Sequence, residues 1–203
     1  VENQVENTGF YLDDVAVNES EVNKDGLLIV KDFSEVKTKS DNPKPITYAY
    51  TSEAKYIEFG KRKGIDLETQ LLFEKMLRAF CEKNKVESEF EKTNTLPKSF
   101  VDYQANLYDS LFTKSSLKST KGGINVLFKD YEGGGSMLMP AQIPFMGAGW
   151  DNIVSRIDIV DIASIIHLYD RTFYRNKLET IVGFSGRYNL TGSNDRMSSG
   201  MAF

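Results

Sequence analysis

Glycine is distributed unevenly along this chain of 203 residues, and the unevenness limits the folds that the chain can adopt. Four of the fifteen glycines lie in residues 1–120, and the other eleven lie in residues 121–203. Glycine weakens the interior of helices and suits tight turns, where it adopts backbone conformations that other residues avoid. We therefore expect helices in the first part of the chain and short strands joined by turns in the second.

The balance of basic and acidic residues also changes near residue 120. The first 120 residues hold 17 basic and 21 acidic side chains, and the last 83 hold eight of each. Residues 115–123 are rich in Ser, Thr, Lys and Gly, a composition typical of flexible linkers between domains. We predict two domains, 1–118 and 119–203. The predicted fold class has two parts, an α+β N-terminal domain and then an all-β Greek-key sandwich.

The N-terminal part contains signals for both strands and helices. The β-rich runs at 26–30 and 46–50 predict two short strands. Asp66 is a suitable N-cap for a helix over about 66–85, and a second helix is expected after Pro97. In the first of these helices, apolar side chains recur at helical spacing and are expected to pack in the core: Leu67, Leu71, Leu72, Met76 and Phe80.

Composition excludes several classes of chemistry. The chain has one cysteine, Cys81, and one histidine, His167. A chain of this kind cannot form an internal disulfide, a zinc site with two thiolates or a multi-histidine metal centre. Cys81 lies beside the apolar stripe of the predicted helix, and His167 lies in an apolar strand, so both are expected to be structural. We assign no catalytic residue and predict that the protein is not an enzyme, although this prediction is weaker for the N-terminal part.

Charge and hydropathy exclude two classes of partner. The chain carries 25 basic and 29 acidic residues, a net charge of −4, and it lacks the basic surplus of non-specific nucleic-acid binders. Lys61, Arg62 and Lys63 are interpreted as a solvated turn before the long helix. No apolar run approaches the roughly 18 to 20 residues that a membrane span requires. We therefore expect neither a nucleic-acid partner nor a membrane span.

The second part of the chain contains short apolar alternations separated by Gly, Asn and Asp. They lie at 124–128, 156–160, 165–169 and 180–184. Such a series of short strands with turn residues between them favours a small antiparallel sandwich with Greek-key connections.

An internal repeat lies within this second part. Residues 150–156 and 193–199 share one pattern, in which two adjacent Asx residues are followed by two spacers and a serine. An apolar strand that ends in an aromatic residue and a turn precedes each copy, at 126–136 and at 166–174. The second part is therefore interpreted as two copies of a unit of about 40 residues.

This doubled arrangement resembles the microbial βγ-crystallin domain with its paired calcium-binding motif, over about residues 121–203. In that family each calcium ion is clamped between the two motifs. The resemblance implies a Greek-key sandwich and a set of oxygen ligands from both motifs. These ligands are Asp151, Asn152, Ile153 (by its carbonyl) and Ser155, then Asn194, Asp195, Arg196 (by its carbonyl) and Ser198, with hairpin carbonyls near Lys129 and Asp170 in addition.

The sequence departs from the family pattern at several places, and its first hairpin is about one residue shorter than usual. Arg156 stands where the family usually has a second serine, and Ser193 replaces the tryptophan that precedes the first Asx pair. The second hairpin, residues 174–178, lacks the expected Gly and Ser. Asn176 can still adopt the left-handed conformation that such a hairpin requires.

Calcium suits these residues because it is a hard cation that takes 6–8 oxygen ligands in tolerant geometry. Each motif holds one full carboxylate, Asp151 or Asp195. So few charges indicate an affinity on the order of 10⁻⁵ to 10⁻³ M, the range of extracellular modules. We therefore expect a bacterial calcium-binding protein that is secreted or lies at the cell surface, with an unknown protein or glycan partner.

Two alternatives remain open. In the first, the N-terminal part is a hydrolase or inhibitor domain, with Glu53 and Glu58 as a candidate carboxylate pair, and the second part is a stabilising accessory. In the second, the sandwich is an adhesion or glycan-binding module that uses exposed aromatic residues, such as Tyr169, Phe173 and Tyr174.

Overall fold

A computed structural model describes most of the chain. The described residues are 9–35, 43–112, 126–129, 136–138, 142–147, 151–152, 154–159, 164–184, 186–190 and 196–203. The predicted linker at 115–123, and with it the predicted domain boundary, lies outside them.

The first part of the chain contains strands and helices in mixed order. Its strands are β1 (Phe10–Leu12), β2 (Val15–Ala16), β3 (Leu28–Asp32) and β4 (Ile46–Tyr50), with a short 3₁₀ helix η1 (Glu19–Glu21) between β2 and β3. Its helices are α1 (Glu53–Lys63), α2 (Leu67–Asn84), α3 (Val86–Thr93) and α4 (Lys98–Phe112). The second part contributes strands: β5 (Val126–Lys129), β6 (Ser136–Leu138), β7 (Gln142–Ile143), β8 (Arg156–Ile159), β9 (Ser164–Arg171), β10 (Arg175–Gly183), β11 (Gly186–Asn189) and β12 (Ser199–Ala202).

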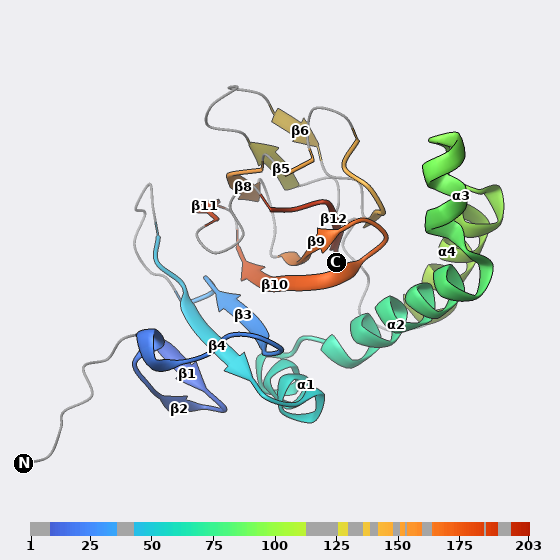
Figure 1. Cartoon of the computed structure of the whole chain (residues 1–203). Coiled ribbons are helices and arrows are strands. Elements are labelled where there is room, and N and C mark those ends of the chain that lie inside the picture. Colours follow the sequence, from blue (N-terminus) through green and yellow to red (C-terminus); the bar gives the residue numbers. More distant parts are fainter. Residues whose placement is uncertain are drawn as a thin grey trace, which may run out of the picture.

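The larger sheet contains strands from both parts of the chain. Its eight strands follow the order β2-β1-β4-β3-β10-β9-β12-β7. The pairs β1–β4 and β3–β10 are parallel, and the remaining pairs are antiparallel. Figure 1 shows β3 and β4 continuing the sheet beyond β10.

The predicted two-part fold class is therefore wrong. The chain forms a single mixed α/β fold, because β3 hydrogen-bonds to β10 and so makes one continuous sheet from residues before 51 and after 163. An all-β sandwich standing apart from an α+β domain would leave the outer edge of β10 unpaired. Unpaired N–H and C=O groups along that edge offer a site for another strand, and β3 occupies it.

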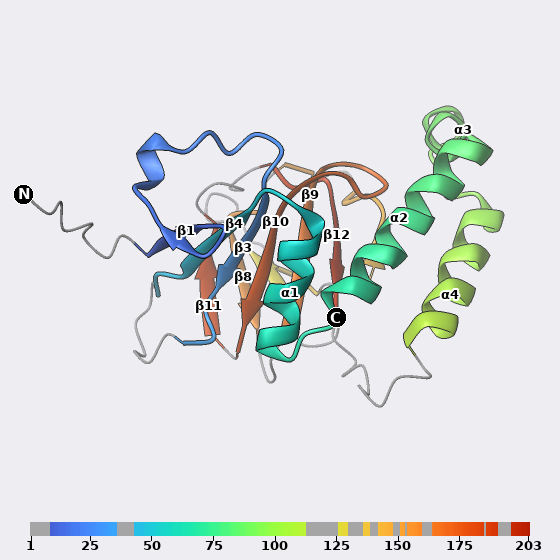
Figure 2. The same cartoon turned by 90° about the horizontal axis from the view of Figure 1, so that it is seen from below.

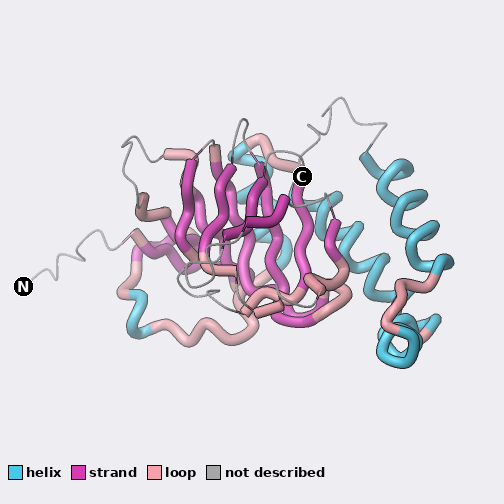
Figure 3. The backbone as a smooth tube through the Cα atoms, turned by 90° about the horizontal axis from the view of Figure 1, so that it is seen from above, coloured by secondary structure: helices cyan, strands magenta, loops and turns pink. Residues whose placement is uncertain are grey.

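The smaller sheet has the order β11-β8-β5-β6, with antiparallel pairs throughout. The two sequence repeats exchange one strand each. The third strand of the first repeat, β7, pairs with β12, while the third strand of the second repeat, β11, pairs with β8. Each repeat therefore contributes to both sheets. Figure 3 shows the strands gathered at the centre, with α2, α3 and α4 at one end.

The predicted helices and strands of the first part are confirmed, but the expectation that Leu72 and Met76 pack in the core is wrong, because the face of α2 that carries them is exposed. The Asp66 side chain accepts a hydrogen bond from the Thr69 N–H at 3.0 Å and caps α2. The helix α4 begins directly after Pro97, and β3 and β4 lie close to the two predicted strands.

The prediction that the basic run at 61–63 forms a solvated turn before the long helix is wrong. These three residues form the last helical turn of α1. The helix ends at Gly64, whose φ of 71° is the left-handed conformation typical of a helix C-cap. Basic side chains are favourable there because the C-terminus of a helix carries a partial negative charge. The Ser52 side chain, which accepts from the Lys55 N–H, is the N-cap.

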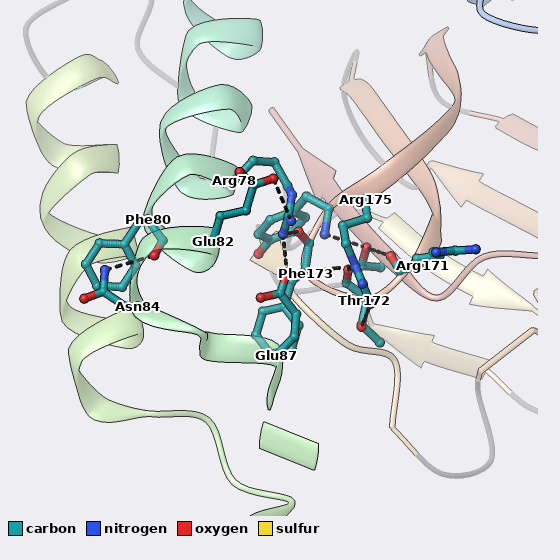
Figure 4. Close-up of polar contacts among 11 residues, drawn as sticks. Arg78, Phe80, Glu82, Asn84, Glu87, Arg171, Thr172, Phe173 and Arg175 are labelled. Atoms are coloured by element: carbon teal, nitrogen blue, oxygen red, sulfur yellow. Dashed lines mark hydrogen bonds and ion pairs between the residues drawn. The ribbon is translucent and has the colours of Figure 1, made fainter. Parts of the chain in front are cut away.

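The helices at the end of the molecule pack around the hairpin that joins β9 to β10. Phe173 at its tip is 1% exposed and makes edge contacts with the rings of Phe90 and Phe100. Arg78 on α2 donates a hydrogen bond to the Phe173 carbonyl at 2.9 Å and forms an ion pair with Glu87 at 2.6 Å (Figure 4). Figure 2 shows α1 lying along the sheet, with α3 and α4 beyond its edge. The hairpin is therefore enclosed by helices from the first part of the chain.

Two neighbouring residues on α2 test whether the chain unfolds as one unit. Phe73 is fully buried against α4 and Phe203, whereas Leu72 is 46% exposed. We expect Phe73→Ala to lower the free energy of unfolding by about 3–5 kcal/mol, and Leu72→Ala to lower it by less than about 1 kcal/mol.

Both far-UV circular dichroism and the fluorescence of Trp150, the only tryptophan, should report the same lowered midpoint in urea for Phe73→Ala. A Trp150 transition that stays at the wild-type midpoint would show that the second part unfolds independently.

Candidate functional site

The fold brings the two repeated motifs together. The Asn152 backbone N–H donates to the Met197 carbonyl at 3.0 Å, and the Ser198 hydroxyl donates to Asn152 Oδ1 at 3.2 Å. These residues are about 46 positions apart in the chain. Asn152 has a φ of 58°, a left-handed conformation that asparagine tolerates better than most residues.

Backbone hydrogen bonds hold both serines of the motifs in place. The Ser198 N–H donates to the Tyr169 carbonyl at 2.9 Å, and its carbonyl accepts from the Met146 N–H at 3.0 Å. The Ser155 carbonyl accepts from the Leu190 N–H at 2.9 Å. Both serines are buried, whereas Asp151 and Asn152 are exposed. The buried Ser198 hydroxyl therefore contacts an Asx side chain that is exposed to solvent.

A second polar group lies beside the second motif. Asp170 Oδ2 accepts from Asn176 Nδ2 at 3.1 Å and lies 3.4 Å from Arg196 Nη2. Asn176 has a φ of 57°, which confirms the left-handed conformation anticipated for this hairpin. The sequence suggested the carbonyl near Asp170 as a ligand, whereas here it is the Asp170 carboxylate that faces the second motif.

Some predicted ligands cannot be placed. Ile153, Asn194 and Asp195 lie outside the described residues, and for Lys129 only the backbone, within β5, is described. Arg156, at the position where the family has serine, forms an ion pair on its own strand with Asp158 at 2.8 Å.

The described residues offer hard oxygen donors for a cation. They contain no group of three or more His, Cys, Asp or Glu side chains suited to a metal. The oxygens that do meet are the amide oxygen of Asn152 and the hydroxyl of Ser198, next to the Asp151 carboxylate, which accepts from Asn152 Nδ2 at 3.3 Å. Two oxygens 3.2 Å apart, each about 2.3–2.6 Å from one calcium ion, would subtend an angle of roughly 80° at the ion, which its tolerant coordination accepts. The amide oxygen of Asn152 and the hydroxyl of Ser198 are thus oxygen donors of the kind that calcium takes as ligands.

The only histidine belongs to a buried hydrogen-bonded chain between α1, α2 and the sheet. His167 Nε2 lies 2.7 Å from Gln70 Oε1, and Nδ1 lies 3.1 Å from Thr180 Oγ1, which in turn lies 2.8 Å from the Tyr56 hydroxyl. Because an amide oxygen only accepts, Nε2 carries the proton and Nδ1 accepts from Thr180. Burial, and then the charge of Lys177, hold the pKa of His167 well below its usual value. His167 is therefore a neutral structural residue, as the sequence predicted.

Two further sequence interpretations can be judged from burial. Cys81 is buried, and burial raises the pKa of its thiol to about 12, so it stays protonated and packs as a small hydrophobe. Tyr169, Phe173 and Tyr174 are each at most 2% exposed. The prediction that these rings form an exposed glycan-binding surface is wrong, because the helices of the first part cover them.

Comparison with known proteins gives no family for this chain. No protein-family model matches the sequence, and a search of the curated proteins finds no similar one. Within the described part of the chain, no helix is both long enough and apolar enough to cross a membrane.

The buried, hydrogen-bonded His167 predicts that the stability of the protein depends on pH. The folded-state pKa lies below the unfolded value of about 6.5, so the unfolded state binds the extra proton as the pH falls below 6.5. Between pH 6.5 and 5, we expect the unfolding free energy of the wild type to fall faster than that of His167→Gln. The difference between the two slopes should be up to about 1.4 kcal/mol per pH unit. Urea unfolding at pH 7, 6 and 5 measures both slopes. Equal slopes would mean that His167 is readily protonated in the folded state.

Proposed function

We propose that the protein binds calcium at the junction of its two Asx-x-x-Ser loops, and that the ion stabilises the folded chain. The observation that carries the proposal is the contact of Asn152 Oδ1 with the Ser198 hydroxyl, across 46 residues, together with the Asn152–Met197 backbone hydrogen bond.

The described residues would have separate roles toward the ion. The exposed Asp151 carboxylate supplies the charge that attracts a cation, and Asn152 and Ser198 supply neutral oxygens whose positions are fixed by the fold. Asn194, Asp195 and the carbonyl of Ile153 are proposed further ligands from the motif pattern. A hard cation with 6–8 oxygen ligands matches such a set better than a soft metal does.

The proposed effect of the ion is thermodynamic. Unfolding separates the two loops, so calcium binds the folded state and not the unfolded chain, and mass action shifts the equilibrium towards folding. A site with few carboxylates is weak and fills at the millimolar calcium concentrations found outside cells. We accordingly propose that the protein works as a structural or binding protein in a secreted or cell-surface setting.

The proposal is tested by thermal and urea unfolding with calcium, magnesium or EDTA. For a dissociation constant near 10⁻⁴ M, about 10 mM calcium should raise the unfolding free energy by about 2.7 kcal/mol. Magnesium should have a much smaller effect, because it requires near-ideal octahedral geometry and loses its water reluctantly.

Asp151→Asn removes the exposed charge with little change of shape. We expect it to weaken calcium binding about tenfold, so that the same calcium concentration stabilises the variant by only about 1.4 kcal/mol. Asp102→Asn, at an exposed position on α4, is the matched control and should respond to calcium as wild type does. If calcium and EDTA leave the wild-type midpoint unchanged, and calorimetry detects no binding, the proposal is wrong.

A further inference from the structure

The side of α2 that points away from the rest of the protein carries apolar side chains at its centre. The buried side of this helix consists of Leu67, Gln70, Leu71, Phe73, Glu74, Leu77 and Cys81. Because an α-helix has about 3.6 residues per turn, five exposed residues line up on the opposite side. This outer stripe of α2 consists of Glu68, Leu72, Met76, Ala79 and Lys83. Leu72 is 46% exposed and Met76 is 37% exposed.

The two ends of the outer stripe carry opposite charges. Glu68 lies in the first turn of α2 and Lys83 lies in its last turn. Within the residues that the structure describes, neither side chain takes part in an ion pair or a hydrogen bond. The helix dipole favours charges of these signs at these ends, but it does not account for the apolar residues between them. An acidic end, an apolar centre and a basic end are together complementary to a reversed copy of the same stripe.

We propose that the outer stripe of α2 binds the same stripe of a second copy of this chain, with the two helices antiparallel. Such a pair is symmetric, so each contact occurs twice. With the two-fold axis at the middle of the stripe, Glu68 of each copy faces Lys83 of the other. The two charged residues are 15 positions apart, or about 22 Å at 1.5 Å per residue, so both ion pairs form in one register. In that register Leu72 faces Ala79 of the second copy, and the two Met76 side chains meet near the axis.

Charge selects the antiparallel orientation. A parallel pair would place Glu68 beside Glu68 and Lys83 beside Lys83, and such like-charge contacts are unfavourable. Lys75 lies next to the stripe near the two-fold axis, and it is already paired with Glu53 of its own chain. The interface is small, so the association is weak, with a dissociation constant on the order of 10⁻⁴ M. No residue of the Asx loops takes part in it.

Sedimentation equilibrium of the full chain in EDTA tests the proposal, at protein concentrations from about 10 μM to about 1 mM. We expect wild type to follow a monomer–dimer equilibrium. Glu68→Lys places like charges opposite each other at both ends of the interface and should weaken dimerisation at least tenfold. Adding Lys83→Glu to this variant restores opposite charges and should return the dissociation constant to within about threefold of the wild-type value. Only antiparallel pairing in the proposed register predicts this rescue.

The matched control is Lys98→Glu with Asp102→Lys, which exchanges the charges of an exposed ion pair on α4. It should dimerise as wild type does. If circular dichroism shows that a charge variant does not fold, Leu72→Gln replaces an exposed apolar side chain and should itself weaken dimerisation about tenfold, because the contact is lost twice.

Three results would overturn the proposal. Wild type that stays monomeric at about 1 mM would leave the outer stripe of α2 to a partner of another kind. A folded Glu68→Lys or Leu72→Gln that dimerises as well as wild type would place the dimer interface elsewhere. A folded charge-exchange variant that does not recover dimerisation would exclude the antiparallel register.

Discussion

The hydrogen bonds between β3 and β10 are the interaction on which the rest of the structure depends. Thr180 pairs with Val30 and Val182 with Asp32, and just beyond the strand the Phe33 N–H donates to the Val182 carbonyl at 2.8 Å. This parallel pairing joins segments about 150 residues apart in the chain. Once it forms, the face of β10 that carries Thr180 lies against α1 and α2, and polar groups there must find partners inside the protein.

A buried hydrogen-bond network supplies these internal partners, and it consists of Tyr56, Thr180, His167 and Gln70. A nearby ion pair between Lys177 and Glu74, at 3.2 Å, serves the same interface between the sheet and α2. Apart from the His167–Thr180 hydrogen bond, each of these contacts joins a residue of the helical region to a residue of the last strands. These polar contacts fix how the helices lie on the sheet, while the aromatic side chains around Phe173 pack the helices against the β9–β10 hairpin.

The two proposed binding surfaces depend on the tertiary structure in different ways. The two Asx loops come together because the two repeats exchange their third strands, which brings the segment before β8 close to the segment before β12. The outer stripe of α2 lies within one helix, and it is exposed because the opposite side of α2 packs against α4 and the sheet. Sequence patterning could identify the Asx-x-x-Ser motifs, since their residue types and spacing are local. It placed Leu72 and Met76 in the core, because apolar spacing alone does not show that a helix carries apolar residues on two sides.

The amino-acid sequence by itself determined the local elements. Asp66 and the apolar spacing behind it specify α2, Pro97 precedes the start of α4, and the repeated Asx pairs mark the two loops. These features depend on capping, periodicity and turn preference, which act over a few residues. Only the tertiary structure decided that β3 pairs with β10 and that Tyr169 and Tyr174 are buried. The physical reason is that the open edge of a strand can hydrogen-bond to many other strands, and an aromatic side chain can pack against many apolar surfaces. Which of these partners is used depends on the arrangement of the whole folded chain.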